Sequence, residues 1–307
     1  MDGVHRVGGV HGLGGFLVPH GEPPLFSRSA RESLGEISGG VRVSREFLDA
    51  YGKVMAKWPD GTGHLDVAGP YGTTHVHTLG PRDAPPLLLL PGGGATGASW
   101  FANAGALDTR YRVYAPDLVG EPGRSVAAPD RPIRTVADLA GWLDALLDGL
   151  GVPEADLCGH SYGAWIALHY ALRGGGRVRR LTLLDPTRCY AGFAPGYLLR
   201  ALPMLLRPTP GRVRRFLAWE TRGAALDADW LALQEAAAGF PGARPVTGRI
   251  PVLDGGPAVR VVLAGESRAH DVARVAARAG ADVTVVPGVS HHGMPLQLGP
   301  RLAELLD

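Results

Sequence analysis

The stretch ADLCGHSYGAWIALHYAL, residues 155 to 172, places a serine between a short apolar run and a longer one. At its centre, GHSYG over residues 159 to 163 is typical of a strand, a sharp turn and a helix, with Ser161 at the turn. The two glycines of this motif permit a tight bend that larger side chains would block. We therefore predict a nucleophile elbow that presents the Ser161 hydroxyl, and a motif this short needs support from the surrounding sequence.

The sequence on either side of the motif alternates between strand and helix patterns. Short apolar runs, typical of strands buried on both faces, occupy residues 87–90, 111–115, 157–159, 181–184, 259–264 and 283–286. Amphipathic helical patterns lie between most of them, for example over residues 135–150. A helical pattern at 43–58 and an antiparallel hairpin at 64–69 and 73–79 precede the first run. We predict an α/β fold with a doubly wound, mostly parallel sheet of about eight strands.

Composition and charge limit the classes of partner. The chain has 307 residues, with 31 basic and 29 acidic side chains and a net charge of +2. This balance does not favour nucleic acid or a membrane, so we expect a small-molecule substrate. Cys158 and Cys189 are too few for a disulfide framework, and we expect both to be reduced, buried thiols. No secretory signal pattern and no run of 18 apolar residues is found, which predicts a cytoplasmic protein.

Unusual residues follow the predicted strands at their carboxyl ends, where doubly wound sheets hold their sites. They are Pro91 to Gly94, Asp117, Ser161, Asp185, Gly265 with Glu266, and His291. An antiparallel edge followed by a glycine loop, serine, acid and histidine resembles the α/β-hydrolase fold, over residues 45 to 307. The segments LLLLPGGG, GHSYGAWIAL, RRLTLLDP and VVPGVSHH are similar to those of bacterial carboxylesterase-like members of that superfamily. The resemblance implies a serine hydrolase with a catalytic triad.

The resemblance also implies which groups assist the serine. A serine hydroxyl is a weak nucleophile near neutral pH and needs a base. The superfamily carries that histidine after the last strand, which implies His291, with the adjacent His292 as a competitor. The backbone N–H groups of Gly93 and Tyr162 are the implied oxyanion hole for the charge that develops in the transition state. This chemistry requires no cofactor and no metal.

The acid that orients the histidine has several candidates. Relatives usually carry it in a GExD-like pattern after the strand at 259–264, and this chain has Arg268 at the expected carboxylate position. Asp185, after the preceding strand, matches the placement in the branch that resembles pancreatic lipases, and we take it as the first candidate. Glu266 is the alternative acid, and Asp271 lies near the same loop. A further alternative is that no carboxylate orients the histidine, which would lower turnover about 10⁴-fold.

Residues 186–257 occupy the place where the superfamily inserts a cap after the sixth strand, and we predict a helical lid with an apolar underside. Its apolar side chains are Tyr190, Phe193, Tyr197, Leu198, Leu199, Leu202, Met204, Leu205, Leu206, Phe216, Leu217 and Trp219. A helical subdomain without a substrate role is the alternative. We interpret the arginines at positions 200, 207, 212, 214 and 215 as a solvated lid face, with an acidic substrate or partner as the alternative.

Residues 1–40 are glycine-rich and have no sustained period, which predicts an N-terminal arm. Residues 1–15, MDGVHRVGGVHGLGG, weakly resemble the start of the nitrile hydratase beta subunit, a segment that packs on the partner subunit in that family. We therefore expect the arm to serve packing or homo-oligomerisation. Its histidines, His5, His11 and His20, are interpreted as solvated and not as metal ligands. The core then comprises residues 41–185 and 258–307, on either side of the cap.

These patterns together predict a serine hydrolase. It would cleave an ester, thioester or similar acyl bond of a small to mid-sized apolar substrate, through an acyl-enzyme on Ser161 with His291 as base. One alternative is a non-catalytic protein of the same fold, used for binding or assembly and lacking a complete triad. Another is a fold relative with acyl transferase or perhydrolase activity. The distinction depends on which carboxylate, if any, lies within hydrogen-bond reach of His291.

Overall fold

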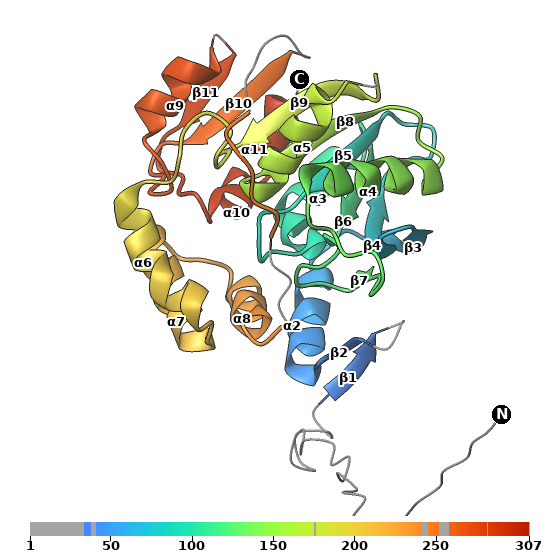
Figure 1. Cartoon of the computed structure of the whole chain (residues 1–307), viewed down its shortest axis with the longest axis horizontal. Helices are drawn as coiled ribbons and strands as arrows, with labels where there is room; N and C mark the ends of the chain where they lie inside the picture. Colours follow the sequence, from blue (N-terminus) through green and yellow to red (C-terminus); the bar gives the residue numbers. More distant parts are fainter. Residues whose placement is uncertain are drawn as a thin grey trace, which may run out of the picture. The chain divides into compact units, whose positions relative to one another are not determined.

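A nine-stranded sheet forms the centre of the protein in the computed structural model, which describes residues 34–37, 41–174, 176–240, 245–251, 258–280 and 282–306. The strands are β3 (Gly63–Gly69), β4 (Gly72–Leu79), β5 (Pro86–Leu90), β6 (Arg112–Pro116), β7 (Val126–Ala127), β8 (Ala155–His160), β9 (Val178–Leu184), β10 (Val259–Ala264) and β11 (Val283–Val286). Their order is β11-β10-β9-β8-β5-β6-β4-β3, with β7 paired to β4 (Figure 1).

The predicted mixture of parallel and antiparallel pairs is confirmed. From β11 to β6 the neighbours are parallel, whereas β3 pairs with β4 as the predicted antiparallel hairpin, and β4 is antiparallel to β6. The prediction of about eight strands is one too low, because β7 is only two residues long and has no apolar run to reveal it. With β7 counted, the insertion predicted after the sixth strand follows the seventh.

Alternate residues of the central strands enter two different apolar layers. On β5, Leu88 and Leu90 face one cluster and Leu87 and Leu89 the other, and all four side chains are fully buried. This alternation explains why a parallel strand covered on both faces reads as a continuous apolar run. The first cluster includes α4 (Val136–Gly149), α5 (Tyr162–Leu172) and α9 (Val272–Ala279). The second includes α3 (Phe101–Leu107), α10 (Met294–Leu298) and α11 (Arg301–Leu305).

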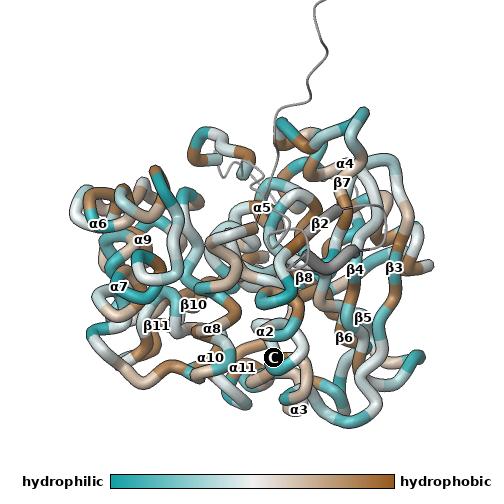
Figure 2. Tube along the Cα trace, turned by 90° about the horizontal axis from the view of Figure 1, so that it is seen from below, coloured by the Kyte–Doolittle hydropathy of each residue, from teal (hydrophilic) through white to brown (hydrophobic). Residues whose placement is uncertain are grey.

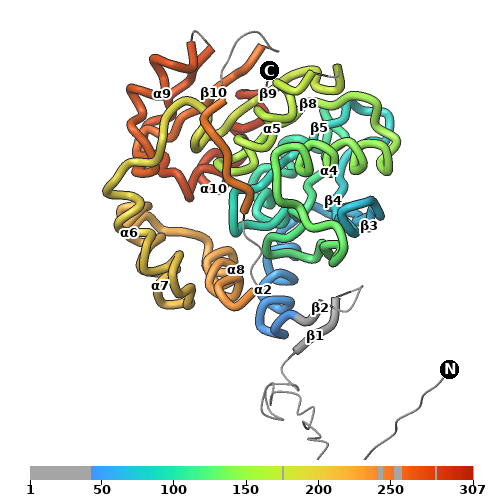
Figure 3. Tube along the Cα trace, in the orientation of Figure 1, coloured from blue at the N-terminus to red at the C-terminus, as the bar shows by residue number. Residues whose placement is uncertain are grey.

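Three helices lie between β9 and β10, in the region predicted to be a cap. They are α6 (Pro195–Leu206), α7 (Pro210–Glu220) and α8 (Ala228–Ala237), and the trace shows them together, next to α2 (Arg45–Met55) (Figure 3). A third apolar cluster joins these four helices through Phe47, Tyr197, Phe216, Trp230 and Leu233. The amphipathic helix predicted at 43–58 is shorter than expected, since α2 covers residues 45–55. Ser44 caps the start of α2 and is also the last residue of β2 (Val41–Ser44). β2 pairs with β1 (Leu34–Ile37).

The remaining predictions on organisation have mixed outcomes. Cys158 and Cys189 are free and buried, as predicted. No helix within the described ranges is long and apolar enough to cross a membrane. The predicted arm, residues 1–40 with its three histidines, lies outside the described residues except for β1, so its role in packing or homo-oligomerisation stays a prediction.

Candidate active site

Ser161 occupies the sharp turn between β8 and α5. Its backbone has φ 53° and ψ −110°, a conformation that costs energy for any residue other than glycine. A Cβ atom at Gly159 would collide with the backbone of Gly163, and one at Gly163 would collide with the Leu90 carbonyl oxygen. Both glycines are therefore needed for the strand and the helix to approach each other. The turn holds the Ser161 side chain beyond the carboxyl end of β8.

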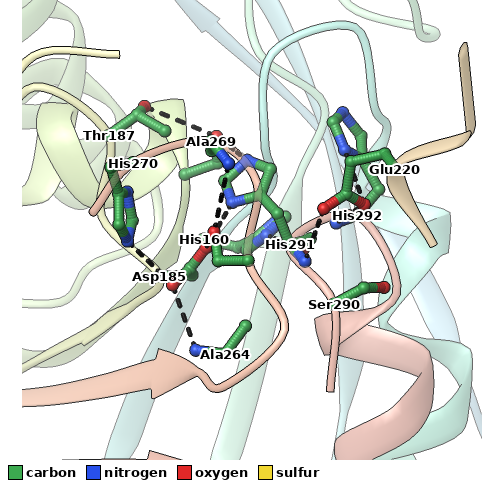
Figure 4. Close-up of polar contacts among 12 residues, drawn as sticks. His160, Asp185, Thr187, Glu220, Ala264, Ala269, His270, Ser290, His291 and His292 are labelled. Atoms are coloured by element: carbon green, nitrogen blue, oxygen red, sulfur yellow. Dashed lines mark hydrogen bonds and ion pairs between the residues drawn. The ribbon is translucent and has the colours of Figure 1, made fainter. Parts of the chain in front are cut away.

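His291 lies between Ser161 and Asp185. Its Nε2 is 2.9 Å from Ser161 Oγ. Its Nδ1 is 2.6 Å from Oδ2 of Asp185, and both of these residues are labelled in Figure 4. Asp185 follows β9, and His291 follows β11 by way of a short turn. Both side chains are almost wholly buried. The carboxyl ends of three strands thus bring together the serine, the histidine and the carboxylate that the sequence singled out.

Asp185 is fixed by more than His291. Its Oδ1 accepts a hydrogen bond from the Ala264 N–H at 3.0 Å, and its Oδ2 accepts one from Ser267 Oγ at 2.7 Å. His270 Nε2 lies 3.1 Å from Oδ1 (Figure 4). Burial by itself raises the pKa of Asp185, but the contacts with His270 and His291 outweigh it and hold that pKa far below its usual range. Asp185 is therefore an anion that is locked in one orientation.

The same anion makes His291 a stronger base. Burial alone would lower the pKa of His291, but the hydrogen bond to Asp185 and the charges of Asp185 and Glu220 raise it above its usual value of 6.5. His292, the predicted competitor, is turned toward Glu220, with its Nδ1 3.3 Å from that carboxylate. Burial lowers the pKa of His292. Of the two neighbours, His291 is the one within hydrogen-bond distance of Ser161 Oγ.

Glu220, at the end of α7, holds the loop that carries both histidines. Its two carboxylate oxygens accept the backbone N–H groups of His291 and His292, each at 3.0 Å (Figure 4). The side chain is fully buried. Burial would raise the pKa of Glu220, but the contacts with His292 and the nearby histidine charges lower it to about 2. A helix of the predicted cap thus fixes the position of the base with a buried negative charge.

The other carboxylate candidates point elsewhere. Glu266 forms an ion pair with Arg222, at 3.0 Å, and is half exposed. Asp271 caps α9, where its Oδ1 accepts the Arg274 N–H at 2.9 Å. The guanidinium of Arg268, at the position where relatives carry the acid, lies 4.6 Å from the centre of the Trp219 ring. Neither carboxylate has a hydrogen bond to His291 in the part of the chain that the structure describes.

The two predicted oxyanion donors lie close together. A Cβ atom at Gly93 would be 3.5 Å from the Cβ of Tyr162, and one at Gly92 would be 3.5 Å from that of Ser161. Within the described ranges, the N–H groups of Gly93 and Tyr162 donate to no other group. The Gly94 N–H donates to the buried Glu121 at 2.9 Å, and burial raises the pKa of Glu121 to about 7. These contacts leave two backbone donors next to Ser161 for a reacting oxygen.

A hollow of about 440 Å³, open solvent included, adjoins these groups. Ser161, His291 and Gly93 line it on the sheet side. Trp230 and Gln234 of α8 line it from the predicted cap, and Trp100 contributes a further apolar wall. The lining thus combines apolar side chains with Ser161 and His291. No group of three His, Cys, Asp or Glu side chains that could hold a metal ion occurs among the described residues.

Several residues at the site have no clear signal in the sequence. Glu220 contacts the His291 loop across 71 positions of sequence, and Ser267 reaches Asp185 across 82. His160 lines the hollow, and its Nε2 also donates to the His291 carbonyl at 2.9 Å. Burial lowers the pKa of His160 to about 3, so this imidazole is neutral. Only His160, through its place in the elbow motif, could have been noticed in advance.

Comparison with known proteins gives a consistent family. The sequence model of the Alpha/beta hydrolase family matches residues 87–305. Carboxylesterase YbfK of Bacillus subtilis (strain 168) is 34% identical over 155 residues, which are 50% of this chain and 52% of that protein. The uncharacterized carboxylesterase nap of the same organism is 30% identical over 188 residues, 61% of this chain and 60% of that protein. The chain thus spans about half to three fifths of these curated relatives.

Solved structures show the same fold over more of the chain. The crystal structure of carboxylesterase CesB (YbfK) from Bacillus subtilis covers 85% of this chain and 96% of its own, with a TM-score of 0.75 and 24% identity. That of naproxen esterase (carboxylesterase NP) from Bacillus subtilis covers 89% and 100%, with a TM-score of 0.74 and 24% identity. At this identity the likeness concerns the fold alone.

Proposed function

Because the chain belongs to the Alpha/beta hydrolase family, we propose that it is a carboxylic ester hydrolase that forms an acyl-enzyme on Ser161. The observation that carries the proposal is the position of His291, 2.9 Å from Ser161 Oγ and 2.6 Å from Asp185 Oδ2. This is the arrangement in which a histidine can take the serine proton while a carboxylate fixes its tautomer. Similarity to two proteins named carboxylesterases supports an ester as the substrate.

Acylation uses the groups around Ser161 in sequence. Ser161 Oγ attacks the ester carbonyl carbon as its proton passes to His291 Nε2. The carbonyl oxygen becomes an oxyanion, which the N–H groups of Gly93 and Tyr162 stabilise by about 3 kcal/mol per donor. The imidazolium is stabilised by Asp185, whose carboxylate remains ionised. His291 then gives its proton to the leaving alkoxide, and the acyl group stays on Ser161.

Deacylation repeats these steps with water. His291 takes a proton from a water molecule, which attacks the acyl carbon through a second oxyanion at the same two donors. The proton returns to Ser161 Oγ as the carboxylic acid leaves. Because only neutral His291 can act as base, and its pKa is raised above 6.5, the rate is expected to fall as the pH drops through that pKa.

The walls of the hollow support a substrate that is small and mainly apolar. Trp100, Trp230 and Pro295 supply apolar surface, and Gln234 adds one neutral amide. The nitrogen of that amide is buried and has no partner within the described residues.

The alternative of a non-catalytic protein of this fold was suggested by Arg268, at the position expected for the acid, and by the N-terminal arm, which lies mostly outside the described residues. Asp185 lies within hydrogen-bond distance of His291, and Arg268 packs on Trp219. The arginine at position 268 therefore does not deprive His291 of a carboxylate partner. A complete set of nucleophile, base, acid and oxyanion donors favours catalysis.

Hydrolysis of p-nitrophenyl esters with acetyl, butyryl and octanoyl groups tests the proposal. We expect the wild type to turn over at least the short esters, and Ser161→Ala to lose about 10⁵-fold or more. A fluorophosphonate probe should modify one residue, and peptide mapping should find the label on Ser161. Equal background rates for both proteins across all three chain lengths, with no labelling, would refute the proposal.

A further inference from the structure

Helix α6 exposes a row of leucines. Eight large apolar side chains are exposed among the described residues, and five of them lie on this one helix: Leu198, Leu199, Leu202, Leu205 and Leu206. Leu199 and Leu206 are seven residues apart, which places them on the same face of the helix, and they are 72% and 76% exposed. These leucines were predicted to lie on the apolar underside of a lid, and their exposure contradicts that prediction. A cluster of this kind on a surface usually marks an interaction site.

The other side of α6 already has its core contacts. Tyr197 and Ala201 are buried in the cluster shared with α7 and α8. The Tyr197 ring lies 6.2 Å from the rings of both His291 and His292. α6 is therefore apolar on both faces, whereas an ordinary surface helix is polar on its outer face. Core packing accounts for the apolar residues on the inner face of α6, Tyr197 and Ala201. It does not account for the exposed leucines on the outer face.

The exposed charged side chains of α6 and α7 are all positive. Between Asp185 and Glu220 the sequence has six arginines and no acidic residue. Figure 2 shows α6 and α7 beside each other, and the arginines on or next to them are Arg200, Arg207, Arg212, Arg214 and Arg215. Arg214 pairs with Glu235 of α8. Within the described ranges, Arg207 and Arg215 form no ion pair, and both are exposed. Glu220, the one acid of these helices, is fully buried.

We infer that the outer face of α6 docks the protein on an anionic phospholipid surface. Leucines that enter the acyl boundary and arginines that meet lipid phosphates are the combination that binds a helix to such a surface. A second copy of this chain fits less well, because a symmetric contact would bring the same arginines against each other without an acid between them. The balanced net charge of the whole chain led to the prediction that no membrane is a partner. The local charge of α6 and α7 revises that prediction for this face.

Binding to vesicles tests the inference separately from the esterase proposal. The Ser161→Ala protein is used, so that no lipid ester is hydrolysed during the measurement. We expect it to co-sediment with phosphatidylglycerol-rich vesicles, to bind phosphatidylcholine vesicles far more weakly, and to be released by salt. The added substitutions Leu199→Ser and Leu206→Ser should reduce the partition coefficient about tenfold or more. Replacing Arg207 and Arg215 by Gln should reduce binding to anionic vesicles alone.

Two control variants distinguish binding by the outer face of α6 from nonspecific binding to vesicles. Leu65→Ser removes a half-exposed leucine of β3, and Arg82→Gln removes an exposed arginine before β5, and both should leave vesicle binding unchanged. The leucine variants in the active protein should hydrolyse a short soluble ester like wild type, which shows that they fold. Absence of binding to anionic vesicles, or equal binding by the leucine variants, overturns the inference. A further outcome also overturns it: the protein binds no vesicles but forms a dimer in solution, and the leucine substitutions dissociate that dimer. The outer face of α6 would then serve self-association.

Discussion

The carboxyl end of the sheet and the outer face of α6 distribute charge and apolar surface in opposite ways. At the sheet end, Asp185 and Glu220 are fully buried carboxylates, and each one meets several donors. On α6, Leu199 and Leu206 are largely exposed while the tyrosine on the inner face is buried. Both regions depart from the usual pattern of charge outside and leucine inside. In the proposed mechanism the buried carboxylates hold His291, whereas the exposed leucines have no part in that mechanism and contribute little to the packed core.

The largest effect should come from the buried region. His291→Ala removes the base and should lower kcat/KM for a p-nitrophenyl ester by about 10⁵-fold or more. His292→Ala is the matched control, because it removes a neighbouring imidazole that contacts Glu220 and not Ser161. It should cost about tenfold or less, since only one hydrogen bond is lost. Equal losses in the two variants would mean that the two histidines share the role of base.

A pair of leucines tests the same contrast through stability. Leu233 of α8 is fully buried in the cluster that joins α2 to the cap helices, so Leu233→Ala should lower the free energy of unfolding by about 2 to 5 kcal/mol. Leu199→Ala should change it by less than about 0.5 kcal/mol, because that side chain loses little buried surface. Urea denaturation measures both. A comparable loss at Leu199 would show that the outer row of α6 is packed against another part of the chain.

Glu220→Gln should have a much smaller effect on rate than His291→Ala and a distinct effect on its pH dependence. The amide leaves one of the two backbone N–H groups without an acceptor, which should lower kcat about tenfold. Because the charge of Glu220 helps to raise the pKa of His291, its loss should move the acid limb of the pH profile to lower pH. An unchanged acid limb would contradict the role of that charge.

The same substitution has a predicted signature in stability. The pKa of Glu220 is lowered from 4.5 to about 2, so its ionised form stabilises the folded state above pH 4.5 and loses this effect as the pH falls toward 2. The difference in unfolding free energy between wild type and Glu220→Gln should therefore be largest near neutral pH and shrink in acid.

Much of the fold was predictable because its central strands are covered on both faces. Leu87 to Leu90 read as one apolar run since alternate side chains enter two separate clusters. The elbow was predictable because Gly159 and Gly163 are required by contacts that any Cβ atom would break. The two-residue β7 was not, since it is held by pairing with β4 and has no pattern of its own.

The identity of the acid and the outer face of α6 were not predictable from the sequence. Asp185 and Glu266 both follow strands, and only the pairing of β9 with β10 brings the Ala264 N–H and Ser267 onto Asp185. Glu266 instead meets Arg222, a residue of the predicted cap. On α6, apolar residues occupy both faces, so periodicity could not tell which row is buried. Tertiary contacts decide both questions.

The orienting acid is the central claim, and matched variants of the two carboxylates test it most directly. Asp185→Asn keeps the shape of the side chain and should lower kcat for a p-nitrophenyl ester about 10⁴-fold, because the neutral amide no longer fixes the tautomer of His291. Glu266→Gln should keep kcat within about twofold of wild type, since it removes only a partly exposed ion pair with Arg222. The opposite result, a large loss at Glu266 and near-normal turnover in Asp185→Asn, would contradict the account.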